Sequence, residues 1–171
     1  GVCGGCAWQD LDYAEQVRHK AAQVDDALRR LGRIEIELEP IVPATEQYGY
    51  RNKLEYSWAA APEGPALGFH RAGRWDELVP VETCHIASPA GNDVRRAFER
   101  WAREAGLAVY DGRTGEGYLR NLVVREGAHT GQILAMLVTA AGAVPEPDRL
   151  RALVPESVVG VVHAENAGLG E

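Results

Sequence analysis

The sequence lacks the features that would place the protein in a membrane or cross-link it. It contains only 3 cysteines in 171 residues, and no apolar run approaches the ~18 residues that a membrane-spanning helix needs. A chain of this length can bury a sizeable core without disulfides, so the cysteines are not needed for stability. Their odd number and the missing signal peptide predict a reducing, cytoplasmic setting without a membrane partner.

An excess of basic residues is also missing. The chain has 18 Lys and Arg against 25 Asp and Glu, which gives a formal net charge of -7. Free-standing nucleic-acid binders are usually basic, so this balance argues against strong RNA or DNA binding by the chain alone but permits a local basic strip. The chain opens at Gly1 and has 1 Met, and we expect further functional segments outside it. We expect the chain to be a monomer.

The segments that are present follow helix and strand periods. Apolar residues at three- and four-residue steps predict helices at residues 10–31 and 89–106, with a short helix at 145–155. This order of hairpins and separate helices predicts an α+β fold with a largely antiparallel sheet and flanking helices. We expect one domain over residues 1–171, with residues 1–9 as an arm. Alternating patterns predict strands at residues 33–42, 50–60, 66–72, 77–86, 118–125, 132–139 and 157–166.

The Cys-Gly-Gly-Cys motif at Cys3 and Cys6 precedes every predicted element, so the fold itself does not need these thiols. Three interpretations compete. A thioredoxin-like redox pair normally follows a strand, which is absent here. A zinc site would need further ligands, which Cys84 and His85 could supply. An iron–sulfur cluster usually takes four cysteines, and this chain has three. For Cys84 the plain alternative is a buried apolar residue at a strand end.

The segment that begins with this motif, CGGCAWQDLDYAEQVRHK, resembles the signature of the uracil-C5 RNA methyltransferases, which make 5-methyluridine in ribosomal or transfer RNA. Four later segments match the same family in the same order, and the series covers roughly residues 3–131. The combination is specific, although any one segment is weak. The matching residues are Cys3, Gly4, Gly5, Cys6, Gln9, Leu11, Tyr13 and Lys20, then Gly49 to Lys53, Leu67 to Phe69, Cys84, and Leu119 with Arg120 and Arg125.

The resemblance implies that Cys3, Cys6 and Cys84 are three of the four ligands of a 4Fe-4S cluster, with the fourth cysteine before Gly1. In the family this cluster is thought to be structural or to help RNA folding, and not to transfer the methyl group. A three-cysteine site leaves one iron open to solvent and oxygen. We therefore expect residues 1–171 alone to lose the cluster.

The resemblance also implies two further domains. An N-terminal β-barrel RNA-binding domain precedes the cysteines, and a C-terminal Rossmann-like domain binds S-adenosylmethionine and carries the nucleophilic cysteine and the general base. The chain shows no glycine-rich cofactor-binding loop and no cysteine after Cys84. We therefore expect it to be the central domain of an enzyme, with no catalytic residue of its own and no activity alone.

RNA contacts are expected on neighbouring strands. The cations could contact phosphates, and an aromatic ring could stack on an unpaired base. The simpler alternative is a solvated sheet face balanced by nearby acids, and for the whole chain a zinc-stabilised interaction module without an RNA role. The candidate cations are Arg51, Lys53, Arg71, Arg74, Arg120 and Arg125, and the candidate rings are Tyr50, Phe69 and His70.

Overall fold

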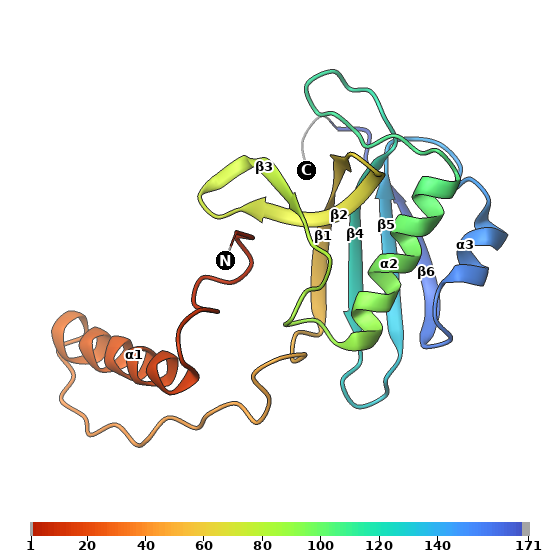
Figure 1. The fold of residues 1–171 in the computed structure, drawn as a ribbon. Helices are drawn as coiled ribbons and strands as arrows, with labels where there is room; N and C mark the ends of the chain where they lie inside the picture. The colour runs from red at the N-terminus through yellow and green to blue at the C-terminus, as the bar shows by residue number, and fades with distance from the viewer. Residues whose placement is uncertain (1, 169–171) are drawn as a thin grey trace. The chain divides into compact units, whose positions relative to one another are not determined.

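The computed structural model describes residues 2–168 and divides the chain into two compact units (Figure 1). Unit 1 contains residues 6–47, and unit 2 contains residues 2–5 together with residues 48–168. None of the described helices is both long enough and apolar enough to cross a membrane. Each unit is described separately below.

Unit 1 consists of a helix followed by an extended segment. Helix α1 spans Tyr13–Asp26 and continues as the π-helical turn η1 at Ala27–Leu31, which confirms the helix predicted at residues 10–31. It begins at Asp12, whose side chain accepts a hydrogen bond of 2.9 Å from the backbone N–H of Ala14 and so satisfies a donor that the first turn leaves open. No residue of α1 is buried. Its stability therefore depends on local interactions more than on core packing.

The strand predicted at residues 33–42 is wrong. The segment has no regular secondary structure, and Ile34 and Ile36 are 49% and 51% exposed. The alternating pattern is real, but a strand also needs a neighbour for its backbone hydrogen bonds, and none of the described strands pairs with this segment. Pro40 and Pro43 remove two further donors.

Unit 2 is built on a six-stranded sheet with the order β3-β2-β1-β4-β5-β6. Neighbouring strands are antiparallel except β5 and β6, which are parallel and connected through helix α3 at Pro147–Leu153. The prediction of an α+β fold with a largely antiparallel sheet is confirmed. The strands are β1 Lys53–Ala61, β2 Gly64–Arg71, β3 Arg74–Pro80, β4 Leu119–Glu126, β5 Ile133–Thr139 and β6 Val158–Glu165.

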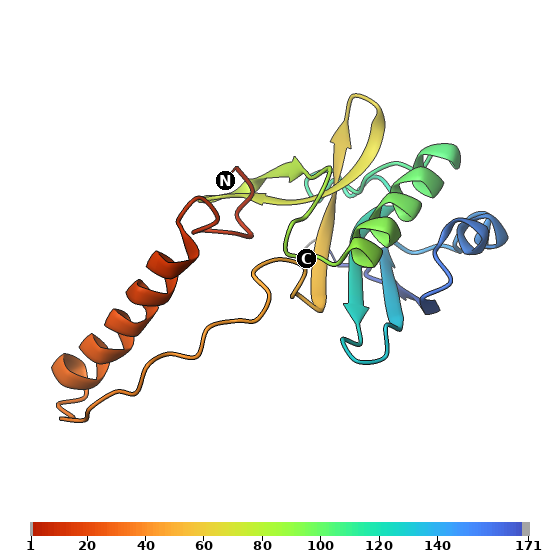
Figure 2. The same cartoon turned by 60° about the horizontal axis from the view of Figure 1, so that its bottom comes forward.

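The core of unit 2 lies between the sheet and helix α2, Pro89–Glu104, which packs with α3 on one face of the sheet (Figures 1 and 2). The helix begins at Ser88, whose hydroxyl accepts a 2.9 Å hydrogen bond from the N–H of Gly91, and proline occupies the first helical position, where no N–H is needed. The largest fully buried side chains come from β1 and α2: Tyr56, Trp58, Phe98 and Trp101. This packing fixes the start of α2, and with it the loop that carries Cys84.

Candidate functional site

Cys84 lies in the loop between β3 and α2. The strand predicted to run from residue 77 to residue 86 ends at Pro80 instead. Both backbone groups of Cys84 are bound by the buried side chain of Asn92. The Cys84 N–H donates to Asn92 Oδ1 at 2.9 Å, and Asn92 Nδ2 donates to the Cys84 carbonyl at 3.0 Å. Asn92 Nδ2 also donates to the carbonyl of Ser88 at 3.1 Å. The position of Cys84 is therefore set by the first turn of α2.

A buried ion pair on α2 holds the same loop to the sheet. Arg95 Nη1 lies 2.7 Å from Glu99 Oε1, and the two side chains are only 3% and 10% exposed. Glu99 also accepts a 2.7 Å hydrogen bond from the backbone N–H of Leu67 in β2, and Arg95 donates to the carbonyl of Glu82. Because both charges are paired and hydrogen-bonded, the usual penalty for burying a charge is offset.

Cys3 is attached to the end of β2. Cys3 forms an antiparallel bridge with Arg71, and the N–H of Gly4 donates to the His70 carbonyl at 2.8 Å. A Cβ atom on Gly4 would lie only 2.8 Å from that carbonyl oxygen, so the first glycine of the motif is required by this close approach. The Cys3 sulfur accepts a hydrogen bond from the N–H of Gly5 at 3.3 Å.

The core of unit 2 contains a buried hydroxyl, that of Tyr56. Tyr56 is fully buried, its ring centre lies 4.8 Å from that of Phe69, and its hydroxyl has no hydrogen-bond partner among the described residues. Burial raises the pKa of Tyr56, and the charges of Cys84, Glu99 and Cys3 raise it further, while Arg95 opposes them.

The cysteines predicted as metal ligands are divided between the two units. The three cysteines form no disulfide. Cys3 and Cys84 belong to unit 2 and Cys6 to unit 1, and residues 2–168 contain no group of three or more His, Cys, Asp and Glu side chains that could hold a metal ion. This finding bears equally on the zinc alternative with His85.

Thiolates are the donors that iron–sulfur clusters take. Ligation by Cys3, Cys6 and Cys84 remains a prediction.

Four of the candidate RNA-contacting residues form an exposed surface at one end of β1 and β4, which we call the cationic edge: Tyr50, Arg51, Lys53 and Arg125. Lys53 lies directly opposite Arg125 across the two strands, and like charges in this position repel. Lys53 is balanced by Glu55 at 3.1 Å, but no described carboxylate forms an ion pair with Arg51 or Arg125. An anion bound here would relieve the repulsion.

The arginines of the β2–β3 hairpin are balanced within the hairpin itself. Arg71 Nε lies 2.6 Å from the carboxylate of Glu77, and Arg74 Nε lies 2.8 Å from that of Asp76. Sequence analysis did not single out Trp75, which is 84% exposed between them. Its position directly after Gly73 and Arg74 was the available signal.

Two other candidates face inward. Arg120 is 8% exposed, its guanidinium lies 4.1 Å above the ring of Tyr110, and it donates to the carbonyls of Asn166 and Gly168. Phe69 packs against the core. RNA contacts by Arg120, Phe69 and Arg71 remain predictions, and the geometry favours the cationic edge over them.

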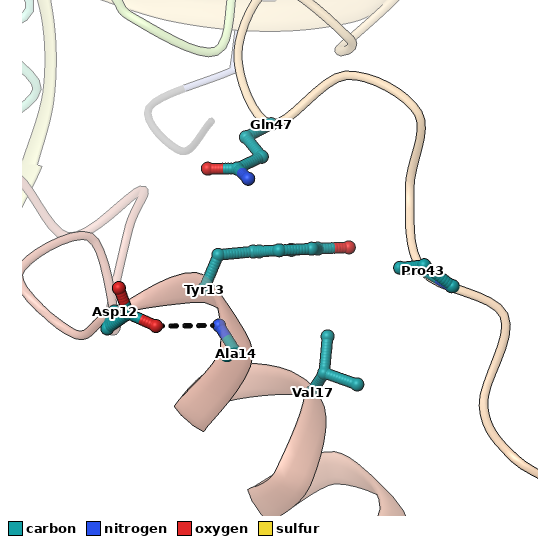
Figure 3. Close-up of a pocket in the computed structure, with 6 residues that line it drawn as sticks. All are labelled: Asp12, Tyr13, Ala14, Val17, Pro43 and Gln47. Carbon is teal, nitrogen blue, oxygen red and sulfur yellow. Dashed lines mark hydrogen bonds between the residues drawn. The ribbon is translucent and has the colours of Figure 1, made fainter.

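Unit 1 contains a shallow pocket between the start of α1 and the extended segment (Figure 3). The Tyr13 hydroxyl accepts a 2.6 Å hydrogen bond from the N–H of Ala44 and so ties the two parts of this unit together. The lining has no cation that would pair with a phosphate, and its single carboxylate, Asp12, caps the helix. It is lined by Asp12, Tyr13, Ala14, Val17, Pro43 and Gln47.

No family model matches the chain, but it is similar to parts of several curated proteins named as uncharacterized RNA methyltransferases. A protein from Bacteroides thetaiotaomicron is 38% identical over 153 residues, which are 81% of this chain and 34% of that protein. A protein from Caldanaerobacter subterraneus subsp. tengcongensis is 36% identical over 97% of this chain and 38% of its own length. One from Nitratidesulfovibrio vulgaris is 38% identical over 96% of this chain and 36% of its own length.

Among solved structures, the chain resembles a tRNA (uracil-54, C5)-methyltransferase from Pyrococcus abyssi, crystallised with S-adenosyl-L-homocysteine. The TM-score is 0.68 at 26% sequence identity, over 86% of this chain and 34% of that protein. Homologues and structural neighbour thus relate the chain to RNA methyltransferases. The chain spans only about a third of the length of the proteins that it matches.

Proposed function

We propose that the chain is the central, RNA-contacting and cluster-holding part of an S-adenosylmethionine-dependent RNA (uracil-C5) methyltransferase that acts on ribosomal or transfer RNA. The observation that carries this proposal is the similarity of nearly the whole chain to about a third of an RNA methyltransferase, with a uracil-C5 enzyme as its structural neighbour. The other two thirds of the matched proteins leave room for the catalytic domain. The S-adenosyl-L-homocysteine in the neighbour supports S-adenosylmethionine as the methyl donor.

The cationic edge supplies this part of the enzyme with its RNA contacts. Arg51, Lys53 and Arg125 are exposed and lie at the same end of β1 and β4, so they would contact phosphates of one backbone stretch. The ring of Tyr50 is 60% exposed beside them and would stack on an unpaired base. The net charge of -7 limits affinity, and we expect the rest of the protein to supply much of it.

Cys3, Cys6 and Cys84 would hold the cluster together with a cysteine outside this chain. The cluster would supply structural cross-linking and would take no part in methyl transfer. This role agrees with the rigid support of Cys84 by Asn92 and of Cys3 by the end of β2. A thiolate reserved as a ligand is not available as a nucleophile, so the covalent chemistry on uracil would take place in the catalytic domain.

The test is a methylation assay with the full-length protein, S-adenosylmethionine carrying a deuterated methyl group, and transfer and ribosomal RNA from cells that lack the gene. Mass spectrometry of the digested nucleosides should show labelled 5-methyluridine, and residues 1–171 alone should produce none. Label on another base, or on no base in either RNA, would contradict the proposal.

A further inference from the structure

The two edge strands of the sheet differ in chemistry. The strand order places β3 at one edge and β6 at the other (Figure 1). Strand β3, RWDELVP, carries the charged residues Arg74, Asp76 and Glu77 and ends in a proline. Charged side chains and proline on an edge strand discourage pairing with a further strand. The edge at β3 therefore has the composition of an edge that stays free.

Strand β6 lacks this protection. Its sequence, VVGVVHAE, contains no lysine, arginine or proline, and no carboxylate before Glu165. After an irregularity at its start, it pairs in unbroken parallel register with β5 from Gly160 to Glu165, and none of the described strands pairs with its other side. An apolar edge strand of this kind offers a row of free N–H and carbonyl groups to which another strand can be added.

The side chains of β6 are apolar on both faces of the sheet. Val161 lies beside Ala135 on the face that carries the core, and Val162 lies beside Met136 on the opposite face. An apolar run on both faces is typical of a strand in the interior of a sheet. Val161 and Val162 are nevertheless 43% and 50% exposed, whereas Ala135 on the neighbouring strand is fully buried. The sequence of β6 thus fits an interior strand, although the described residues leave it at an edge.

We propose that a strand from outside residues 1–171 of the full-length protein pairs with the free edge of β6 and extends the sheet. This chain covers only 38% and 34% of the length of two proteins that it matches, so a full-length protein of that size contains enough further chain. A segment of the same polypeptide is present at a high effective concentration, whereas a second copy must associate from dilute solution. The inference rests on the part of the proposed function that makes the chain one part of a longer enzyme, and not on the cluster or the RNA contacts.

Hydrogen exchange in the full-length protein distinguishes an edge strand from an interior strand. Every second N–H of an edge strand points away from its neighbour and exchanges quickly, whereas an interior strand has partners for both sets. Mass spectrometry with electron-transfer fragmentation should show slow exchange at consecutive amides from Val161 to Glu165. Strand β3 is the internal control, and its amides should alternate between fast and slow. The same alternation along β6 would overturn the inference.

A photo-crosslinker identifies the neighbour of β6. In the full-length protein, Val162→p-benzoylphenylalanine should form a cross-link within one polypeptide, to a residue outside 1–171 that peptide mass spectrometry locates. The same replacement at Arg96, on the exposed side of α2, should form none. Cross-links between two copies, seen as a doubled mass on a denaturing gel, would assign the edge to a dimer and overturn the inference, as would the absence of any cross-link beyond residues 1–171. Failure here would leave the 5-methyluridine expected from the methylation assay unchanged, so the two proposals fail separately.

Discussion

Replacing Glu99 by alanine should destabilise unit 2 far more than an exposed carboxylate on the same helix would. The substitution leaves the 3%-exposed guanidinium of Arg95 without its partner and the N–H of Leu67 without its acceptor. Removing one member of a buried ion pair typically costs about 3–5 kcal/mol, because the remaining charge stays buried and uncompensated. For a protein of this size, each kcal/mol lowers the melting temperature by roughly 2–4 °C. We therefore expect a decrease on the order of 10 °C.

Glu104→Ala is the matched control, because it is the same substitution on the same helix. Glu104 pairs with Arg100 and Arg149 on the surface, and exposed pairs contribute only about 0–1 kcal/mol. Thermal unfolding followed by circular dichroism measures both variants. The double substitution Arg95→Met with Glu99→Leu should recover part of the loss, since no charge then stays buried alone. Equal losses for Glu99→Ala and Glu104→Ala would refute the reasoning.

Three further predictions concern RNA binding, acid stability and local opening. Replacing Lys53 and Arg125 by glutamine in the full-length protein should make the slope of log affinity for RNA against log salt less steep, by about 0.7–0.9 for each lost phosphate contact. Fluorescence anisotropy over a salt series measures this slope. Arg96→Gln, on the exposed side of α2, should leave the slope unchanged. The hydrogen bond from Arg74 lowers the pKa of Asp76 from 3.8 to about 2. The contribution of this pair to stability is therefore present above pH 3.8 and is lost as the pH falls through about 2. Arg74→Gln should return the pKa of Asp76, measured by NMR, to its ordinary value, and an unchanged pKa would contradict the assignment. Because no residue of α1 is buried whereas the inner face of α2 is, amides of α1 should exchange with D₂O faster than those of α2, and equal protection would contradict this description.

The sequence was informative wherever a repeating pattern coincided with core packing. The helix starting at Pro89 and the strands of residues 53–61 and 119–126 were predicted to within a few residues, because their apolar sides are buried against each other. The segment at residues 33–42 has an equally clear alternation and forms no strand. The alternation of apolar and charged residues shows which side chains would face the core if a strand formed. A strand also needs a neighbouring strand that is distant in the sequence, and the alternation says nothing about that neighbour.

The candidate site shows the same division between local and distant information. The thiols and the cations at Lys53 and Arg125 could be picked out by residue type. The sequence could not show that Arg120 is buried whereas Lys53 and Arg125 are exposed. The β4–β5 register shifts between Leu119 and Asn121, and a bulge of this kind redirects the side chain at its centre. Asn92 was equally hidden, since its function depends on a loop that folds back onto its helix.

The strand order also has a consequence for how the protein is made. Strands β1, β2 and β3 pair with sequence neighbours, as do β4 and β5, but the two halves of the sheet join only where β1 meets β4. Between Ala61 and Leu119 the ribosome must add the rest of the first half and all of α2, which takes several seconds at ~5–20 residues per second. During that interval the edge of β1 that later pairs with β4 has no partner. The nascent chain would depend on early docking of α2 or on a chaperone to avoid pairing with another copy at this edge.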